Sequence, residues 1–375
     1  MRLKQLDALR AAAILLVVGR HVTGNPIWYR FGWTGVDLFF VLSGFLISGL
    51  LFREYKSYGS IQIVRFFIRR GLKIYPAYYA LVLGTVAAGA IAKAPIAWHR
   101  IWPDLIFAQS YLEGTWGHLW SLAVEEHFYL LLPLTLWVML KRRPEKRDPF
   151  DRVPLACAAV SAACLLLRSV HLVTGEAFSY QGQMFATHAR LDALSFGVLL
   201  SYFWEFNPSV IDRLFEDGGR SVLTLSLFLL LPALLFEPQH PFMHTVGFSL
   251  LYVGYGGLLL CCLKRLDGRG IIVRGLARLG VYSYTIYLCH RPLSFWCVGD
   301  LTTWSPERIP IVKDHVFLFY VVLSIAAGVI MAKLIELPVL RLRDRLLPAQ
   351  AGMQITAPSL HSKPIYRVMT ASGSN

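Results

Sequence analysis

Two side chains suited to catalysis interrupt the first apolar segment of the chain, Arg10 and His21. Their separation of eleven residues is three helical turns plus about 20°, so a helix would place both on one face, about 16 Å apart along its axis. An imidazole is the usual general base in enzymes because it exchanges protons near neutral pH. We therefore expect His21 to be a candidate general base, on the same helix face as Arg10. The alternative is that the two residues anchor the two ends of a membrane helix.

A second polar cluster lies at the start of another apolar segment, within Trp120–Tyr129. Ser121, Glu125 and Tyr129 follow one another at intervals of four residues and therefore share a helix face, with Glu126 beside them. A polar stripe in Leu-rich sequence indicates a cavity wall. The alternative is that the two carboxylates only suit the positive N-terminus of a helix.

Three further ionisable residues lie in or at the edge of apolar segments: Asp37, His290 and Glu336. A charge at the centre of a bilayer costs about 2.5–3.5 kcal/mol on insertion scales, so such residues usually pair or line a polar cavity. We include all three as candidates for catalysis or substrate binding. For His290 a structural role is equally compatible with the sequence.

A cluster of cations, Arg65, Arg69, Arg70 and Lys73, precedes the apolar run that begins at Ile74. Arg70 and Lys73 are about one helical turn apart. Several cations on one helix face would bind phosphate groups. The same residues could instead serve only to orient the chain in a membrane.

The elements that position these residues are predicted to be membrane-spanning helices. Hydrophobic residues make up 55% of the chain, charged residues 16%, and the mean hydropathy is +0.51, whereas soluble proteins are about 25% charged. The apolar residues form blocks of about the length of a bilayer span. We therefore predict an all-α, polytopic transmembrane bundle of about ten spans, at 6–24, 35–52, 74–93, 119–140, 154–173, 189–206, 221–236, 244–263, 280–299 and 314–336.

The distribution of Lys and Arg predicts the orientation of this bundle. One set of alternating loops contains 26 of these residues and the opposite set contains 4. Because short cytoplasmic loops are enriched in Lys and Arg, both termini are predicted to be cytoplasmic, in a multi-pass protein of the cell (inner) membrane. The net charge of +14 then reflects contact with membrane lipid and an anionic ligand, and nucleic acid is not expected as a partner.

The remaining sequence predicts one domain and no metal site. Residues 1–346 form the transmembrane domain, and 347–375, rich in Ser, Pro and Thr, are expected to be a disordered cytoplasmic tail. The six cysteines lie in or beside apolar blocks without zinc-site spacing. The oligomeric state is not predicted.

Five short motifs together resemble the membrane-bound acyltransferase-3 family, over about residues 5 to 345. They are Asp7-x-Leu9-Arg10 followed by His21; Gly35–Ile47; Trp120-Ser121-Leu122 with Glu125-Glu126 and Phe128-Tyr129; the segment ending Tyr287-Leu288-Cys289-His290; and Glu336-Leu337-Pro338. Their number and order make the resemblance specific.

The resemblance implies an O-acyltransferase that moves an acyl group, usually acetyl, from acyl-CoA to a hydroxyl of a carbohydrate or glycosylated acceptor. Acyl-CoA, here acetyl-CoA, would be a co-substrate, and no cofactor would be permanently bound. His21 would be the catalytic histidine and Arg10 its partner. The family's cytoplasmic Arg-x-x-Arg is Arg70-Gly-Leu-Lys73 here, which keeps the charge but loses one bidentate fork. The cluster from Arg65 to Lys73 would then bind acyl-CoA.

The chemistry of such a transfer assigns roles to these residues. His21 could take the proton of the attacking hydroxyl, or could itself carry the acyl group. Arg10 or Tyr129 could stabilise the oxyanion, and Glu125 could orient the imidazole. The same buried charges would also suit a transporter or flippase of a lipid-linked sugar. A non-catalytic membrane scaffold would leave them without a purpose.

Overall fold

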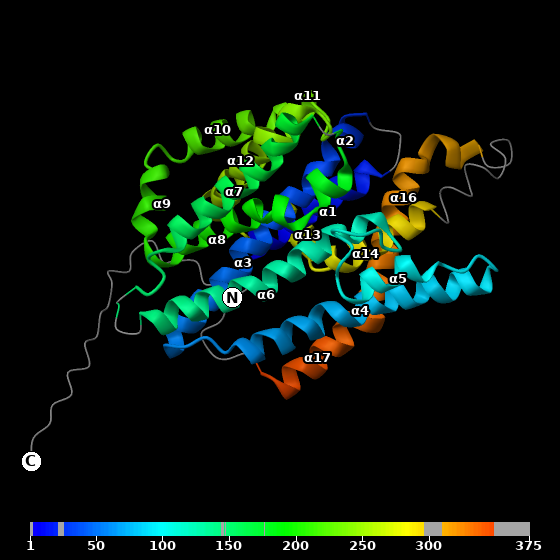
Figure 1. Cartoon of the computed structure of the whole chain (residues 1–375), viewed down its shortest axis with the longest axis horizontal. Helices are drawn as coiled ribbons and strands as arrows, with labels where there is room; N and C mark the ends of the chain where they lie inside the picture. The colour runs from blue at the N-terminus through cyan, green and yellow to red at the C-terminus, as the bar shows by residue number, and fades with distance from the viewer. Residues whose placement is uncertain are drawn as a thin grey trace, which may run out of the picture.

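The structure, a computed structural model, describes residues 3–21, 26–143, 146, 148–175, 177–295 and 310–348. Side chains are described from residue 317 onward in the last of these ranges. Within the described residues every regular element is a helix and no strand occurs, which confirms the predicted all-α class (Figure 1). The predicted tail lies outside the described residues from 349 onward.

The helices follow one another with short connections. Their bounds are α1 (Lys4–Arg20), α2 (Pro26–Phe31), η1 (Gly32–Thr34), α3 (Gly35–Tyr58), α4 (Ile63–Ile91), α5 (Trp98–Leu105), η2 (Gly117–Leu119), α6 (Trp120–Arg142), α7 (Val153–Thr174), η3 (Tyr180–Phe185), η4 (Thr187–Ala189), α8 (Leu191–Phe206), α9 (Pro208–Leu214), α10 (Arg220–Leu230), α11 (Pro232–Leu235), η5 (Met243–Gly247), α12 (Phe248–Arg265), α13 (Ile271–Gly280), α14 (Ser283–Leu293), α16 (Pro310–Met331), η7 (Ala332–Glu336) and α17 (Leu337–Leu346).

Six of the helical segments are long and apolar enough to cross a membrane, and the chain is therefore a membrane protein. In the described part of the chain they are Pro26–Tyr58, Ile63–Ile91, Gly117–Arg142, Val153–Thr174, Met243–Arg265 and Phe317–Leu346. The other four predicted spans coincide with the shorter helices α1, α8, α10 with α11, and α14. The count of ten spans and the cytoplasmic position of both termini remain predictions.

The helix that carries the cation cluster begins earlier than the predicted span at 74–93. Helix α4 begins at Ile63, eleven residues before the predicted span, so Arg65 to Lys73 occupy its first turns. Arg and Lys are strong helix formers, and a helix can extend beyond the apolar part of a membrane. The positions of these Arg and Lys residues therefore did not indicate where the helix begins. Helix α4 also continues through Pro76.

The centre of the bundle depends on a close crossing of α3 and α8. A Cβ atom on Gly44 would lie 2.0 Å from the carbonyl oxygen of Leu194, and one on Gly197 would lie 2.3 Å from that of Val41. Only glycine allows two helix backbones to approach so closely. Helix α1 lies within the bundle next to α3, and α17 runs beside the first part of α4 (Figure 1).

Candidate active site

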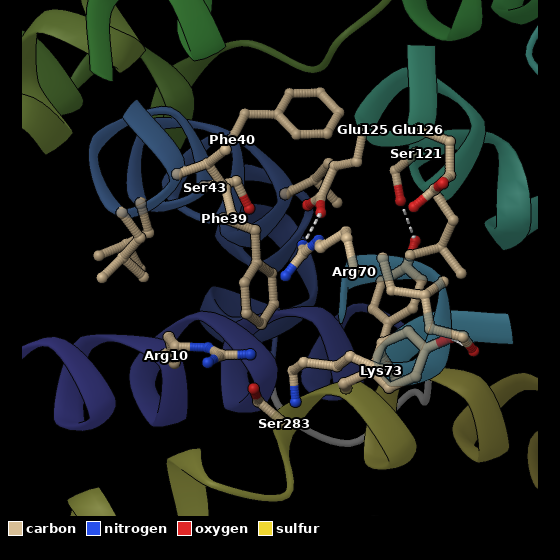
Figure 2. A pocket seen from close by; sticks show the side chains of 18 residues that line it. Arg10, Phe39, Phe40, Ser43, Arg70, Lys73, Ser121, Glu125, Glu126 and Ser283 are labelled. Carbon is tan, nitrogen blue, oxygen red and sulfur yellow. Dashed lines mark hydrogen bonds and ion pairs between the residues drawn. The ribbon is translucent and has the colours of Figure 1, made fainter. Parts of the chain in front are cut away.

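A pocket that we call the cationic pocket opens between α1, α3, α4, α6 and α14 (Figure 2). It has an empty volume of about 830 Å³, including its open mouth. The polar side chains that line it are those of Arg10, Ser43, Arg70, Lys73, Ser121, Glu125, Glu126, Ser283, Tyr284 and Tyr287. The polar stripe predicted on α6 therefore does form a cavity wall, at Ser121 and Glu125, and Arg70 and Lys73 face it from α4.

Two cations of this pocket, Arg70 and Lys73, are paired with carboxylates. A guanidinium nitrogen of Arg70 lies 3.9 Å from a carboxylate oxygen of Glu125, and the same guanidinium lies 4.0 Å from the ring centre of Tyr129. The Tyr129 hydroxyl donates to Glu125. Lys73 Nζ lies 2.6 Å from Glu336 Oε1. These pairs hold the two cations in place inside the bundle, where an isolated charge would be costly.

Glu126 and Tyr129 lie toward a neighbouring hollow between α4 and α6. Both line that hollow together with Arg70, and Tyr75 donates to Glu126 over 3.1 Å. The second carboxylate oxygen of Glu126 is buried without a hydrogen-bond partner. Glu126 therefore lines both the cationic pocket and this hollow. Tyr129 lines only the hollow and contacts Glu125.

A second pocket, which we call the histidine pocket, lies at the other end of α1. It has an empty volume of about 820 Å³, and its lining includes Arg20, His21, Trp33, His118, Trp120, Tyr180, Phe185 and Arg291. His21 follows the last residue of α1, and its Nδ1 lies 2.8 Å from the carbonyl oxygen of Val17. A carbonyl can only accept a hydrogen bond, so the proton is on Nδ1. His21 Nε2 is then the atom with a free lone pair, able to act as a base or a nucleophile.

Three imidazoles meet beside this pocket. The ring of His290 lies 4.9 Å from that of His21 and 4.8 Å from that of His118, between ring centres. His290 is fully buried, and its Nδ1 lies 2.6 Å from the carbonyl oxygen of Tyr287. His290 is absent from the lining of the pocket. His290 therefore packs against the rings of His21 and His118 without lining the pocket itself.

His118 was not among the residues predicted to form the site. Its one signal was its position two residues before the motif that begins at Trp120. The loop that delivers it is fixed by Asp104, which accepts hydrogen bonds from Thr115 N over 2.8 Å and Thr115 Oγ1 over 2.5 Å. Burial raises the pKa of Asp104 to about 6, and the bonds from Thr115 oppose this rise because they stabilise the carboxylate. Arg291, next to His290 in the sequence, was also not selected, although it lines the pocket with His21.

Val36 and Tyr287 line both pockets and form the wall between them. The Tyr287 hydroxyl donates to the carbonyl oxygen of His118 over 2.5 Å, so the Ser121 hydroxyl, 2.6 Å away, donates to Tyr287. This chain of hydrogen bonds links Ser121 in the cationic pocket to the backbone of the histidine pocket. Tyr287 is thereby held in place as a fixed part of the wall.

Two of the roles expected around His21 do not fit this geometry. Arg10 shares a helix with His21 but lines the other pocket, as do Glu125 and its partner Arg70. The imidazole is oriented by the Val17 carbonyl rather than by Glu125. The expectation failed because it grouped residues by chemical type, whereas the length of α1 separates them. Arg20 and Arg291 are the cations that line the same pocket as His21.

The remaining candidates have structural partners. Asp37 is buried and lies 2.6 Å from a guanidinium nitrogen of Arg190, an ion pair that joins α3 to the residue before α8. Asp37 lines neither pocket. Glu336 also lines neither pocket, and it forms an ion pair with Lys73 of the cationic pocket. Asp37 is therefore part of the packing of the bundle, and Glu336 positions a cation.

The predicted phosphate-binding cluster is divided. Arg70 and Lys73 line the cationic pocket, but Arg65 donates to the carbonyl oxygen of Pro348, and Arg69 to that of Leu347. Arg69 also lies 3.1 Å from Asp344 of α17. Two of the four cations thus hold the end of α17. Among the described residues no group of three His, Cys, Asp or Glu side chains is arranged to hold a metal ion.

Comparison with known proteins identifies related sequences. The family model of an acyltransferase domain matches residues 3–333. The chain is 26% identical over 362 residues to the O-acetyltransferase OatA of Staphylococcus aureus (strain NCTC 8325 / PS 47), covering 89% of this chain and 56% of that protein. It is 28% identical over 365 residues to the peptidoglycan O-acetyltransferase OatA of Listeria monocytogenes, covering 89% and 55%. The chain thus spans about half the length of these curated relatives. No solved structure matches it.

Proposed function

This chain belongs to the family of acyltransferase domains, and we propose that it transfers an acetyl group from acetyl-CoA, across the membrane, to a hydroxyl of a carbohydrate. The observation that carries the proposal is the pair of pockets along α1. One contains Arg10, Arg70 and Lys73 together with two glutamates, the other contains His21 and His118 together with two arginines, and Val36 and Tyr287 line both. Such an arrangement provides one site for the donor and another for the acceptor.

The donor would occupy the cationic pocket. The Lys and Arg distribution predicts that the end of the bundle near Arg65 faces the cytoplasm of a cell (inner) membrane, where CoA thioesters are available. Arg70 and Lys73 would bind the phosphates of CoA, exchanging their present carboxylate partners for them. The pantetheine arm would extend along α1 past Val36, bringing the thioester to His21.

His21 would act as an acyl carrier. Its Nε2 would attack the thioester carbon, and CoA would leave as the thiolate. The positive guanidinium of Arg291, which lines the same pocket, would stabilise the oxyanion of the intermediate. We favour a carrier over a simple base because His21 lies in a pocket separate from the proposed donor site. A covalent intermediate allows the donor to leave before the acceptor reacts.

The acceptor would occupy the histidine pocket. Trp33, Trp120, Tyr180 and Phe185 line it, and aromatic faces of this kind pack against sugar rings. A relative is named as a peptidoglycan O-acetyltransferase, so we propose a hydroxyl of a cell-surface glycan as the acceptor. The comparisons give no support to the transporter interpretation of the same buried charges.

The proposal predicts different effects for the neighbouring residues Arg70 and Arg69. Loss of a hydrogen bond to a charged group costs about 1.5–3 kcal/mol, so Arg70→Gln should raise the KM for acetyl-CoA about 10- to 100-fold. Arg69→Gln, its matched control, should change the KM less than about threefold because Arg69 contacts the end of α17. The measurement is the initial rate of label transfer from acetyl-CoA to soluble peptidoglycan fragments by purified protein.

Arg70→Gln also removes the ion-pair partner of Glu125, so a second control must separate this effect from the loss of donor binding. The double variant Arg70→Gln/Glu125→Gln removes that problem and should keep the raised KM, and Arg70→Lys should restore part of the affinity. Equal KM values for Arg70→Gln and Arg69→Gln would refute the assignment of the cationic pocket to the donor. Absence of label transfer by the wild-type protein from acetyl-CoA to any glycan fragment would refute the proposed reaction.

A further inference from the structure

His118 is a buried imidazole that makes no close hydrogen bond. Only 7% of its surface is exposed, and its ring nitrogens meet the backbone carbonyls of Leu288 and Tyr287 only in loose contact. The two neighbouring histidines differ, because His21 and His290 each use Nδ1 to bind a backbone carbonyl. Buried polar groups are normally hydrogen-bonded. Since His118 also lines the histidine pocket, a molecule that enters this pocket can supply a closer partner.

The proposed acyl carrier creates a need for a second base. When His21 Nε2 carries the acetyl group, Nδ1 still holds its proton against the Val17 carbonyl. His21 then has no lone pair with which to take the proton of an attacking hydroxyl. A hydroxyl attacks efficiently only if a positioned base removes its proton.

Among the described residues that line the histidine pocket, His118 is the one suited to this task. The lining contains no carboxylate, and its other ionisable side chains are His21 itself, two arginines and two tyrosines. His290 is not part of the lining. The ring of His118 is presented by the short turn η2, whose backbone is fixed by the hydrogen bond from Tyr287 to the His118 carbonyl oxygen.

We propose that His118 is the general base of the second half-reaction, an inference that rests on the proposed function. In the first half-reaction the His21 Nε2–carbon bond forms, the carbon–sulfur bond breaks, and the CoA thiolate takes a proton from water at the cationic pocket. In the second, the acceptor oxygen attacks the acetyl carbon and the carbon–Nε2 bond breaks. Its electron pair returns to His21, and the hydroxyl proton passes to a ring nitrogen of His118. The His118 imidazolium then releases this proton to water at the mouth of the histidine pocket.

The division of labour between two histidines makes a specific kinetic prediction. With His118→Ala, labelled acetyl-CoA should still release about one equivalent of CoA per protein, and the label should accumulate on His21. Steady-state transfer to peptidoglycan fragments should fall by about 10²–10⁴-fold, the usual contribution of a general base. The measurements are rapid-quench release of CoA, protein-bound label mapped by peptide mass, and acetylated product. His21→Ala, the matched control, should give neither the burst nor the label.

Rescue by a small base separates catalysis from a structural role. Added imidazole should restore formation of the acetylated glycan by His118→Ala, in proportion to its concentration, because the deleted side chain leaves space for it. His118→Phe, which fills that space, should not respond. The inference is overturned if His118→Ala turns over within about threefold of wild type, or if it loses the CoA burst together with turnover. A wild-type protein that releases no CoA would instead contradict the proposed function itself.

Discussion

Replacing His21 by glutamine should lower the turnover number by at least about 100-fold, while the affinity for acetyl-CoA changes less than about threefold. The lost group is the Nε2 lone pair that faces the histidine pocket, and a catalytic histidine contributes about 10²–10⁴-fold or more. Donor affinity should survive because Arg70 and Lys73 lie in the other pocket. The measurements are steady-state transfer to peptidoglycan fragments and equilibrium binding of acetyl-CoA to the purified protein.

His290→Gln is the control for this result, since His290 contacts the ring of His21 but does not line the pocket. It should reduce turnover by less than about tenfold. If His290→Gln abolishes turnover and His21→Gln does not, the roles of the two histidines are the reverse of those proposed. If both variants remain active, transfer does not proceed through a histidine.

Replacing Val36 by tryptophan should also abolish transfer, by more than about 100-fold, with little effect on donor affinity. Val36 forms the wall with Tyr287, and an indole there would block the passage past this wall that we propose for the thioester on its way to His21. Even a displacement of about 1 Å can cost about 100-fold in rate. The measurements are the turnover number and the binding constant for acetyl-CoA, together with thermal unfolding in detergent to confirm that the variant is folded.

Val36→Ala is the matched control, because it widens the passage instead of closing it. It should keep acetyl transfer within about tenfold and improve the use of longer acyl donors such as butyryl-CoA relative to acetyl-CoA. Normal turnover by a folded Val36→Trp variant would show that the acyl group does not pass between the two pockets at this wall.

The relative positions of residues could be predicted from the sequence where one helix carries all of them. The spacing of Ser121 and Glu125 correctly predicted a cavity wall on α6. The separation of Arg10 and His21 along α1 was also predicted correctly, with Arg10 in the middle part of the helix and His21 directly after its last residue. The spacing could not predict which helices pack against α1. Those helices place Arg10 with Arg70 in one pocket and His21 in another.

Contacts between segments that lie far apart in the sequence could not be predicted for the same reason. Asp37 is paired with Arg190 from a segment 153 residues away, a partnership that no local pattern indicates. His118 lies on a three-residue turn, so helical periodicity does not apply to it. The cations from Arg65 to Lys73 were expected to act together, but packing of α17 against α4 engages half of them.

The most direct measurement places the donor and the acceptor on opposite sides of a sealed membrane. Vesicles with one known orientation of the protein receive labelled acetyl-CoA on one face and membrane-impermeant peptidoglycan fragments on the other. We predict acetylated fragments only when acetyl-CoA is on the face nearest Arg70 and the fragments are on the face nearest His21. Product that forms when both substrates are confined to the same face, and not when they are separated, would contradict transfer between the two pockets.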